Sequence, residues 1–282
     1  MKLIVTAALL LCVAVDAWSQ SPAPVHIDGA QRFVITAKKN ETPYQIDLIR
    51  LGSVVAPASE GYRLPVIYLT DGNTLFAMVA QMVGNIVSFS NRLPAVLVVA
   101  IGYPADPAMK LADDITRKQA LRTRDLSPAG AANFLAFIED DLKPFIAGRF
   151  AVDPGEQTLA GHSLGGFFTV YAFLNRPHAF KRYVAASPSL FVNDHAPLKQ
   201  LETFAPRPSL TASRMFISVG GLETKQRMGQ DMIGDARSFA DALQRKDVSG
   251  LDVTFHLFED EDHLSVIPGA LMRGLRAVGS LP

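Results

Sequence analysis

After residue 65 the apolar positions fall into short runs rich in β-branched residues, separated by segments long enough for helices. This alternation is typical of a mostly parallel sheet with helices on both faces. The strands predicted in this region are residues 66–69, 95–101, 157–160, 182–186, 214–219 and 251–258. Two earlier runs, 32–36 and 44–51, flank a polar turn at 38–41 and predict an antiparallel edge.

Two long helices are predicted between these strands. One spans residues 128–149, with Ser127 as its N-cap and Pro128 in the first helical position. The other spans residues 230–246 and is amphipathic, because its apolar residues recur at spacings of three and four: Met232, Ala236, Phe239 and Leu243. The sequence contains no internal repeat and no long linker. We therefore expect one α/β domain.

The N-terminus predicts export. Met1-Lys2 precedes an apolar stretch over 3–15, and Val15-Asp16-Ala17 has the small residues that signal peptidase requires. A membrane anchor is the alternative, but the apolar stretch over 3–15 is shorter than the about 20 apolar residues that a membrane span needs. We predict a signal peptide over residues 1–17, a single domain over 18–282, and a periplasmic or secreted protein.

Charge and cysteine content narrow the possible partners. The chain has 27 basic and 27 acidic residues, so no net field attracts nucleic acid or an anionic membrane. The only cysteine, Cys12, lies in the predicted leader, so we expect no disulfide after cleavage. No metal-binding motif and no phosphate-binding glycine loop are present, and we expect neither a metal nor another cofactor.

The pentapeptide at 161–165, G-H-S-L-G, matches G-x-S-x-G. It follows the predicted strand 157–160 and precedes an apolar run over 167–173 that is long enough for a buried helix. A strand, a sharp turn and a helix in this order form the nucleophile elbow of α/β-hydrolases, in which the turn exposes the serine. The context predicts that Ser163 is a nucleophile.

A serine nucleophile needs a histidine base, which follows the serine and the acid in the chain order of this fold. Four histidines lie downstream of Ser163: His178, His195, His256 and His263. The first two precede the last predicted strands, and His256 lies within one. His263 follows the final strand in an acidic loop and is the predicted base.

The third member of the triad is expected after the preceding strand, where it orients the imidazole. Glu223 is the first carboxylate after the strand 214–219 and is the predicted acid, with Asp231 and Asp260 as alternatives. Two backbone N–H groups must face the oxyanion. We expect these from Leu164, after the serine, and from Asn73, where Asp71-Gly72 forms a turn after the strand 66–69.

Together these residues resemble the esterase D-like family of α/β-hydrolases, in particular its siderophore esterases of the enterobactin and salmochelin type. The similar segments are Y-L-T-D-G-N at 68–73, R-T-R-D-L-S-P at 122–128, G-H-S-L-G-G at 161–166, S-P-S at 187–189, G-G-L-E at 220–223, and His263. The resemblance implies a cofactor-free carboxylic ester hydrolase with catalytic Ser163, His263 and Glu223. It also implies a small-molecule ester as substrate, with a siderophore lactone as the leading candidate.

Two departures leave the substrate open. Residues 190–192 read L-F-V where those esterases tend to carry tryptophan. We also expect no counterpart of the additional N-terminal domain of the cytosolic enterobactin enzymes. Alternatives are an esterase for carbohydrate-linked or simple acyl esters (feruloyl or acetyl type), an acyltransferase, and a non-catalytic binding module. If the substrate is anionic, the candidate contacts are Arg122, Arg124, Lys225 and Arg227, of which Arg124 and Arg227 are preferred.

Overall fold

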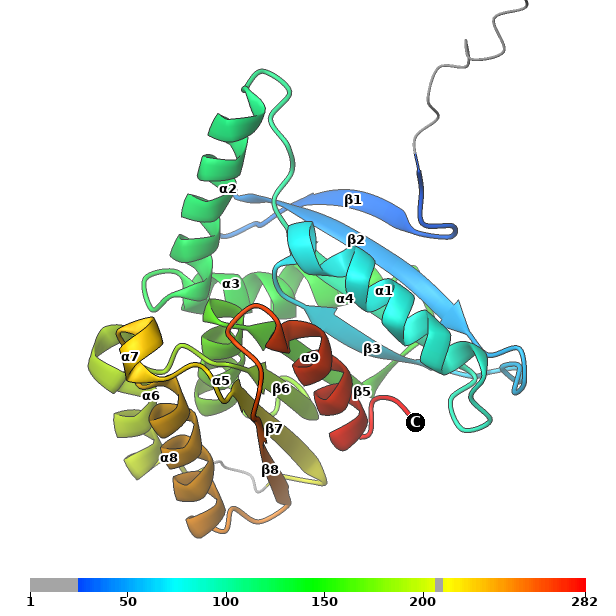
Figure 1. Ribbon diagram of the computed structural model, residues 1–282. Coiled ribbons are helices and arrows are strands. Elements are labelled where there is room, and N and C mark those ends of the chain that lie inside the picture. The colour runs from blue at the N-terminus through cyan, green and yellow to red at the C-terminus, as the bar shows by residue number, and fades with distance from the viewer. Residues whose placement is uncertain (1–24, 206–209) are drawn as a thin grey trace, which may run out of the picture.

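The computed structural model describes residues 25–205 and 210–282, and the predicted signal peptide lies outside them. The strands are β1 (Gln31–Thr36), β2 (Pro43–Gly52), β3 (Leu64–Leu69), β4 (Ala95–Gly102), β5 (Val152–His162), β6 (Arg182–Ala186), β7 (Ser213–Gly220) and β8 (Leu251–Phe258). They form one sheet in the order β1-β2-β4-β3-β5-β6-β7-β8 (Figure 1). β2 pairs antiparallel with β1 and β4, and the other pairs are parallel. The predicted α/β-hydrolase fold is confirmed.

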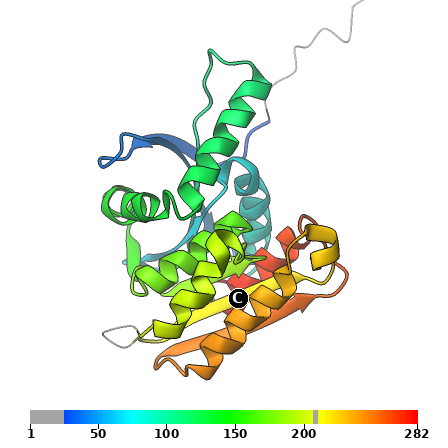
Figure 2. The same cartoon turned by 90° about the vertical axis from the view of Figure 1, so that its left-hand side faces the viewer.

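Helices cover both faces of this sheet. They are α1 (Gly72–Ser88), α2 (Leu111–Leu126), α3 (Ala131–Ala136), α4 (Lys143–Ala147), α5 (Leu164–Asn175), α6 (Val192–Thr203), α7 (Lys225–Met228), α8 (Met232–Arg245) and α9 (Val266–Ala277), with a π-helical stretch, η1 (Phe137–Leu142), between α3 and α4. α1 and α9 pack on one face, and α3 to α6 with α8 pack on the other. α2 projects from the body (Figures 1 and 2). Within the described ranges, no helix combines the length and apolarity that a membrane crossing requires.

The two faces carry separate apolar cores because successive residues of a strand point to opposite sides. In β4, Val96 and Val98 belong to the core beneath α1 and α9, whereas Leu97 and Val99 belong to the opposite core. All four are 0% exposed. Burial on both faces explains why the parallel strands are continuous apolar runs in the sequence.

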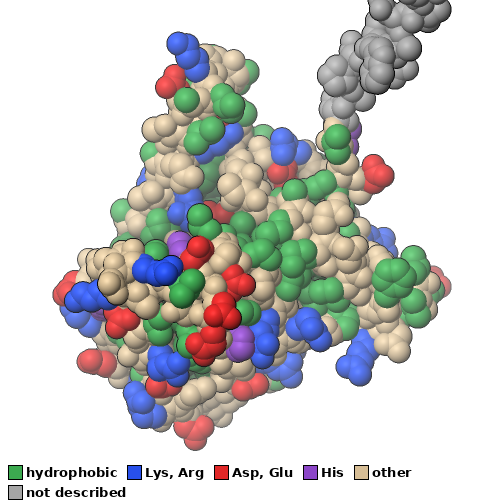
Figure 3. Space-filling model, viewed as in Figure 1, with side chains coloured by type: hydrophobic (Ala, Val, Ile, Leu, Met, Phe, Trp, Pro, Cys, Tyr) green, Lys and Arg blue, Asp and Glu red, His purple; other side chains and the backbone are tan. Residues whose placement is uncertain are grey.

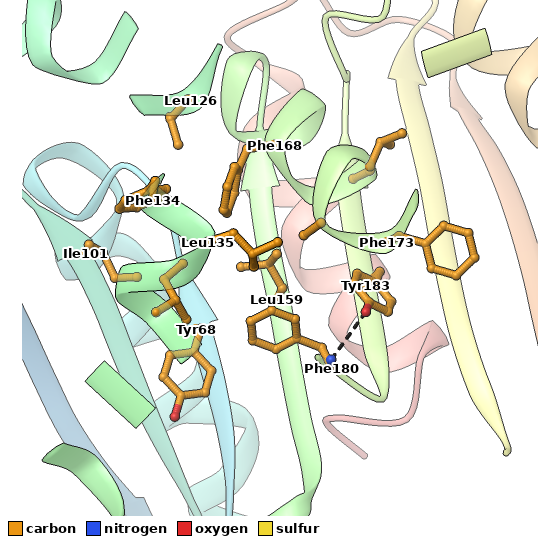
Figure 4. Close-up of a cluster of buried hydrophobic side chains, with 14 of the residues drawn as sticks. Tyr68, Ile101, Leu126, Phe134, Leu135, Leu159, Phe168, Phe173, Phe180 and Tyr183 are labelled. Carbon is orange, nitrogen blue, oxygen red and sulfur yellow. Dashed lines mark hydrogen bonds between the residues drawn. The ribbon is translucent and has the colours of Figure 1, made fainter. Parts of the chain in front are cut away.

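Aromatic side chains fill much of the larger core (Figure 4). Phe168 on α5 packs against Phe134 on α3, with 4.9 Å between ring centroids. Tyr183 on β6 is fully buried, and its hydroxyl accepts a hydrogen bond from the Phe180 N–H at 3.2 Å. Truncating a buried phenylalanine to alanine costs about 3–5 kcal/mol. This core therefore fixes α5, whose first residue follows Ser163, against the sheet.

The predicted helix over 128–149 was wrong at its N-terminus. The helix begins at Ala131, and Ser127 is instead the residue after the last turn of α2. The Ser127 carbonyl accepts hydrogen bonds from the N–H groups of Gly130 and Ala131, so residues 127–130 form a turn between two helices. The prediction over 230–246 was right: α8 buries the four expected apolar residues and is capped by the Asp231 side chain.

Candidate active site

Ser163 lies between the end of β5 and the start of α5, as the elbow predicts. Its backbone has φ 61° and ψ −118°, a conformation that is strained for a residue with a side chain. The Ser163 N–H donates to the Ala186 carbonyl at 3.0 Å, and its carbonyl accepts from the Phe167 and Ser189 N–H groups. The turn is therefore held by β6 and by the segment after it.

The elbow requires glycine on both sides of the serine. A Cβ at Gly161 would contact the Gly165 carbonyl and lie 2.7 Å from Thr70 Oγ1. A Cβ at Gly165 would collide with the same Thr70 hydroxyl. Since the end of β3 leaves no room for side chains here, the glycines of G-x-S-x-G allow the serine to approach β3.

His263 reaches the serine from the loop between β8 and α9. Its Nε2 lies 3.0 Å from Ser163 Oγ, within hydrogen-bonding distance. The Asp262 carboxylate accepts hydrogen bonds from the Leu264 and Ser265 N–H groups at 2.8 and 2.9 Å, which stabilises the loop around the histidine. The geometry suits proton transfer from the serine hydroxyl to the imidazole.

Glu223 completes the arrangement from the loop after β7. One oxygen, Oε2, lies 2.6 Å from His263 Nδ1. The other, Oε1, accepts hydrogen bonds from Ser187 Oγ at 2.5 Å and from the Gly220 N–H at 2.7 Å. Burial alone would raise the pKa of this fully buried carboxyl, but the hydrogen bonds from His263, Ser187 and Gly220 hold its pKa below the ordinary value. Glu223 is therefore ionised opposite the imidazole.

The alternative bases and acids lie elsewhere. His195 Nε2 is 3.2 Å from Asp235 on α8, and the ring of His256 packs edge-on against Phe258. Asp231 caps α8 through the Gly234 N–H, and Asp260 is exposed. None of these side chains is hydrogen-bonded to Ser163 or His263 within the described residues.

Sequence reasoning missed two supporting residues. Ser187, which donates to Glu223, has φ 41° and follows β6, and only the S-P-S similarity drew attention to it. His162 packs against the imidazole of His263, with 4.6 Å between the two ring centroids. Burial, followed by the nearby His263, lowers the pKa of His162 to about 3. No sequence pattern distinguishes this residue from other residues at the variable positions of G-x-S-x-G.

A pocket of about 490 Å³ opens over Ser163 and His263. Its walls include Leu75 and Met78 from α1, Gln119 and Arg122 from α2, and Leu264 and Ile267 around the start of α9. Figure 3 shows hydrophobic side chains over α1 and along the projecting part of α2. Among residues 25–205 and 210–282, no three His, Cys, Asp or Glu side chains gather into a group able to hold a metal.

The two expected oxyanion donors lie in different surroundings. Leu164 is the first residue of α5, so its N–H has no partner within that helix. Asn73 lies at the start of α1 but lines a neighbouring hollow rather than the pocket over Ser163. Its side chain bonds to the backbone of Tyr103, accepting from N–H at 2.7 Å and donating to the carbonyl at 2.9 Å. Asp71 and Thr74, on either side of Gly72 and Asn73 in the same turn, do line the pocket over Ser163.

Of the four basic residues predicted as substrate contacts, Arg122 lines the pocket over Ser163, whereas Arg124, Lys225 and Arg227 do not. Arg124 points to the far side of α2, where its Nε and Nη2 donate to the buried Asp125 carboxylate at 2.7 and 2.9 Å. Arg227 is exposed on α7 and lies near Asp262, whose pKa it helps to lower, after the hydrogen bonds from Ser265 and Leu264.

A serine on a strained turn after a central parallel strand, linked through a histidine to a buried carboxylate, defines a serine hydrolase of the α/β-hydrolase fold. Residues 50–261 match the model of the family described as "Putative esterase". The chain belongs to this family and is a serine esterase.

Similarity to characterised relatives extends over most of the chain. The ferri-bacillibactin esterase BesA of Bacillus subtilis is 32% identical over 263 residues, which are 89% of each chain. The siderophore triacetylfusarinine C esterase of Aspergillus fumigatus is 28% identical over 278 residues, 90% of this chain and 94% of the relative. The crystal structure of the BES protein from Bacillus cereus superimposes with a TM-score of 0.76 at 27% identity, covering 92% and 98% of the two chains.

Proposed function

We propose that this esterase hydrolyses ester bonds of a siderophore. The observation that carries the proposal is similarity over 89% of the chain to a ferri-bacillibactin esterase, together with the hydrogen-bonded Ser163, His263 and Glu223. The triacetylfusarinine C esterase supports the same substrate class from a second, more distant relative.

Each catalytic residue has a role that its position supports. His263 Nε2 takes the proton from Ser163 Oγ as this oxygen attacks the ester carbonyl. The tetrahedral intermediate collapses when the ester C–O bond breaks, and His263 returns the proton to the leaving alkoxide. Water, deprotonated by His263, then hydrolyses the acyl-enzyme and releases the acid. Glu223 keeps the imidazole in the tautomer with a proton on Nδ1 and stabilises its cationic form.

Backbone N–H groups stabilise the oxyanion in this proposal. Leu164 supplies one group, and the turn at the start of α1 supplies the other, with Asn73 as the sequence-based candidate. The N–H groups of Gly72 and Asn73 make no hydrogen bond within the described residues, as expected for the first turn of a helix.

The surroundings of the pocket favour a large substrate. Beyond Arg122 and Gln119, the same side of α2 carries Ile115 and Leu111, at spacings of three and four residues. These two apolar side chains are 50% and 76% exposed. At about 1.5 Å per residue, the stripe extends the pocket wall well beyond the reach of a simple acyl ester. A multi-armed siderophore is large enough to contact it.

Export fits the same proposal. A leader over residues 1–17, removed after Ala17, would deliver the enzyme to a periplasmic or extracellular space. Mass spectrometry of the protein recovered from outside the cytoplasm is expected to give a chain that begins at Trp18. Recovery of a chain that begins at Met1 would contradict the proposed cleavage.

The test of substrate class is a comparison of esters at equal concentration. Purified protein is incubated with catecholate trilactones, free and iron-loaded, with acetylated and feruloylated sugars, and with para-nitrophenyl butyrate, and products are identified by mass spectrometry. We expect linear hydroxy acids from the trilactones at the highest kcat/KM, and none with Ser163→Ala. Rapid cleavage of the sugar esters, with intact trilactones, would transfer the assignment to a carbohydrate esterase.

A further inference from the structure

Arg122 is paired with an acidic residue 51 positions earlier in the chain. Its Nε donates to Asp71 Oδ1 at 2.5 Å and its Nη2 to Asp71 Oδ2 at 3.1 Å, which is a bidentate ion pair. The side chains are 22% and 8% exposed, so solvent screens the pair only in part. The pair links α2 to the turn between β3 and α1.

Asp71 occupies a strained position in that turn. Its φ of 60° and ψ of 36° are left-handed, a region that residues with side chains seldom adopt. The next residue, Gly72, begins α1. Because the Asp71 side chain forms no cap hydrogen bond with its own helix, Arg122 is the main partner that holds this carboxylate in place.

The turn contacts the nucleophile elbow directly. A Cβ at Gly165, two residues after Ser163, would lie 2.9 Å from Asp71 Oδ2. On its other side the turn is held by Asn73, whose side chain bonds to the backbone of Tyr103 just after β4. The turn is thus fixed towards β4 by Asn73 and towards α2 by the ion pair.

We propose that Arg122 is a positioning residue for ester hydrolysis, which acts through Asp71. It holds the β3–α1 turn, and with it the free N–H groups at the start of α1, in a fixed position relative to Ser163. A shift of the turn would misplace an oxyanion donor without altering the serine or its base. This proposal rests on the proposed reaction at Ser163 but not on the natural substrate.

A small neutral ester separates this role from direct substrate binding, because it offers Arg122 no anionic group. With para-nitrophenyl butyrate, Arg122→Met is expected to lower kcat by about 10- to 100-fold, part of the 10²- to 10³-fold that an oxyanion donor supplies. KM is expected to stay within about threefold. Asp71→Asn should give the same loss, and the double variant should be no worse than either single variant, because both remove one interaction.

Arg117→Met is the matched control. Arg117 lies on the same helix, is 27% exposed and pairs with the buried Asp114 at 2.6 Å rather than with Asp71. It is expected to lower Tm about as much as Arg122→Met while leaving kcat unchanged. Should Arg122→Met not fold, Arg122→Lys serves instead: it keeps the charge but not the bidentate geometry, and kcat should fall several-fold. In Arg122→Ala, millimolar guanidinium should restore part of kcat.

Two results would overturn the positioning role. An unchanged kcat on the neutral ester, with a raised KM for an anionic ester alone, would make Arg122 a substrate contact. An equal loss of kcat in Arg117→Met would reduce the ion pair to a general stabiliser of α2. Both results leave the proposed function intact, whereas absence of ester turnover by the unaltered protein would overturn the proposed function first.

Discussion

The imidazole of His162 lies against that of His263, with 4.6 Å between ring centroids and 45° between ring planes. His162 is 5% exposed, and its Nε2 has no hydrogen-bond partner within the described residues. Because burial and the neighbouring imidazole lower its pKa to about 3, His162 stays neutral while, in the proposed mechanism, His263 takes up and returns a proton. The proposed catalytic base therefore packs against an uncharged ring.

This burial predicts a pH-dependent stability. Between pH 6.5, the ordinary pKa of histidine, and the folded value of about 3, the unfolded chain binds more protons at this position, so stability falls as pH falls. His162→Phe removes this titrating imidazole, so the free energy of unfolding should fall less steeply with falling pH, by up to about 1.4 kcal/mol per pH unit. Urea unfolding at a series of acidic pH values measures this slope. The exposed His178→Gln should keep the original slope, and an unaltered slope in His162→Phe would contradict the assignment.

Replacing Glu223 by glutamine tests its role as the orienting acid. Oε1 accepts from Ser187 and Gly220, so the amide oxygen must take that place, and the NH₂ group then faces His263 Nδ1. An NH₂ donor in that place favours the histidine tautomer with its proton on Nε2, which cannot accept the proton of Ser163. We expect Glu223→Gln to lower kcat by about 10²- to 10⁴-fold, and His263→Ala to lower it further.

Asp260→Asn is the matched control for this substitution, because Asp260 is exposed in the neighbouring loop. Its kcat should not change. Full activity in Glu223→Gln beside a collapse in Asp260→Asn would reassign the acid. Since the pKa of Glu223 is held below its ordinary value, Glu223 itself should not limit activity until the pH falls through that lowered value.

Arg124 and Arg227 should respond differently to neutralisation. Arg124→Gln leaves the 1%-exposed Asp125 without its charged partner, so we expect a loss of about 1–3 kcal/mol in the free energy of unfolding and no change in KM. If Arg227 meets an anionic substrate, Arg227→Gln should raise KM for that substrate about two- to fivefold, the effect of an exposed ion pair. Steady-state kinetics on matched anionic and neutral esters, with thermal unfolding, check both. A higher KM in Arg124→Gln would contradict its placement.

The sequence was sufficient to predict the sheet and to select Ser163, His263 and Glu223, whose side chains the structure brings within hydrogen-bonding distance of one another. Parallel strands buried on both faces are conspicuous, and a serine at an elbow restricts where its acid and base occur along the chain. α2 was not predicted because most of its residues are exposed, and polar contacts of its buried acid, Asp114, hold its first turns. A pattern based on apolar spacing does not detect such a helix.

The supporting residues were not predictable for a different reason. Ser187 acts on Glu223 across 36 positions, and Arg122 acts on Asp71 across 51. Such contacts depend on how strands and loops meet at the edge of the sheet rather than on local sequence. Arg122 and Arg124 were both predicted as contacts of an anionic substrate, but the helix turns their side chains to different sides, and of these two only Arg122 lines the pocket.

The most direct test of the account is to trap the nucleophile. The protein is treated with a fluorophosphonate, and the adduct is located by intact mass and peptide mapping. We expect one adduct per chain, on Ser163, since among the serines that the structure describes only this one combines the elbow with a hydrogen-bonded base. Labelling should be absent in Ser163→Ala and slowed by orders of magnitude in His263→Ala. An adduct on another serine, or equal labelling of Ser163→Ala, would contradict the assignment of the active site.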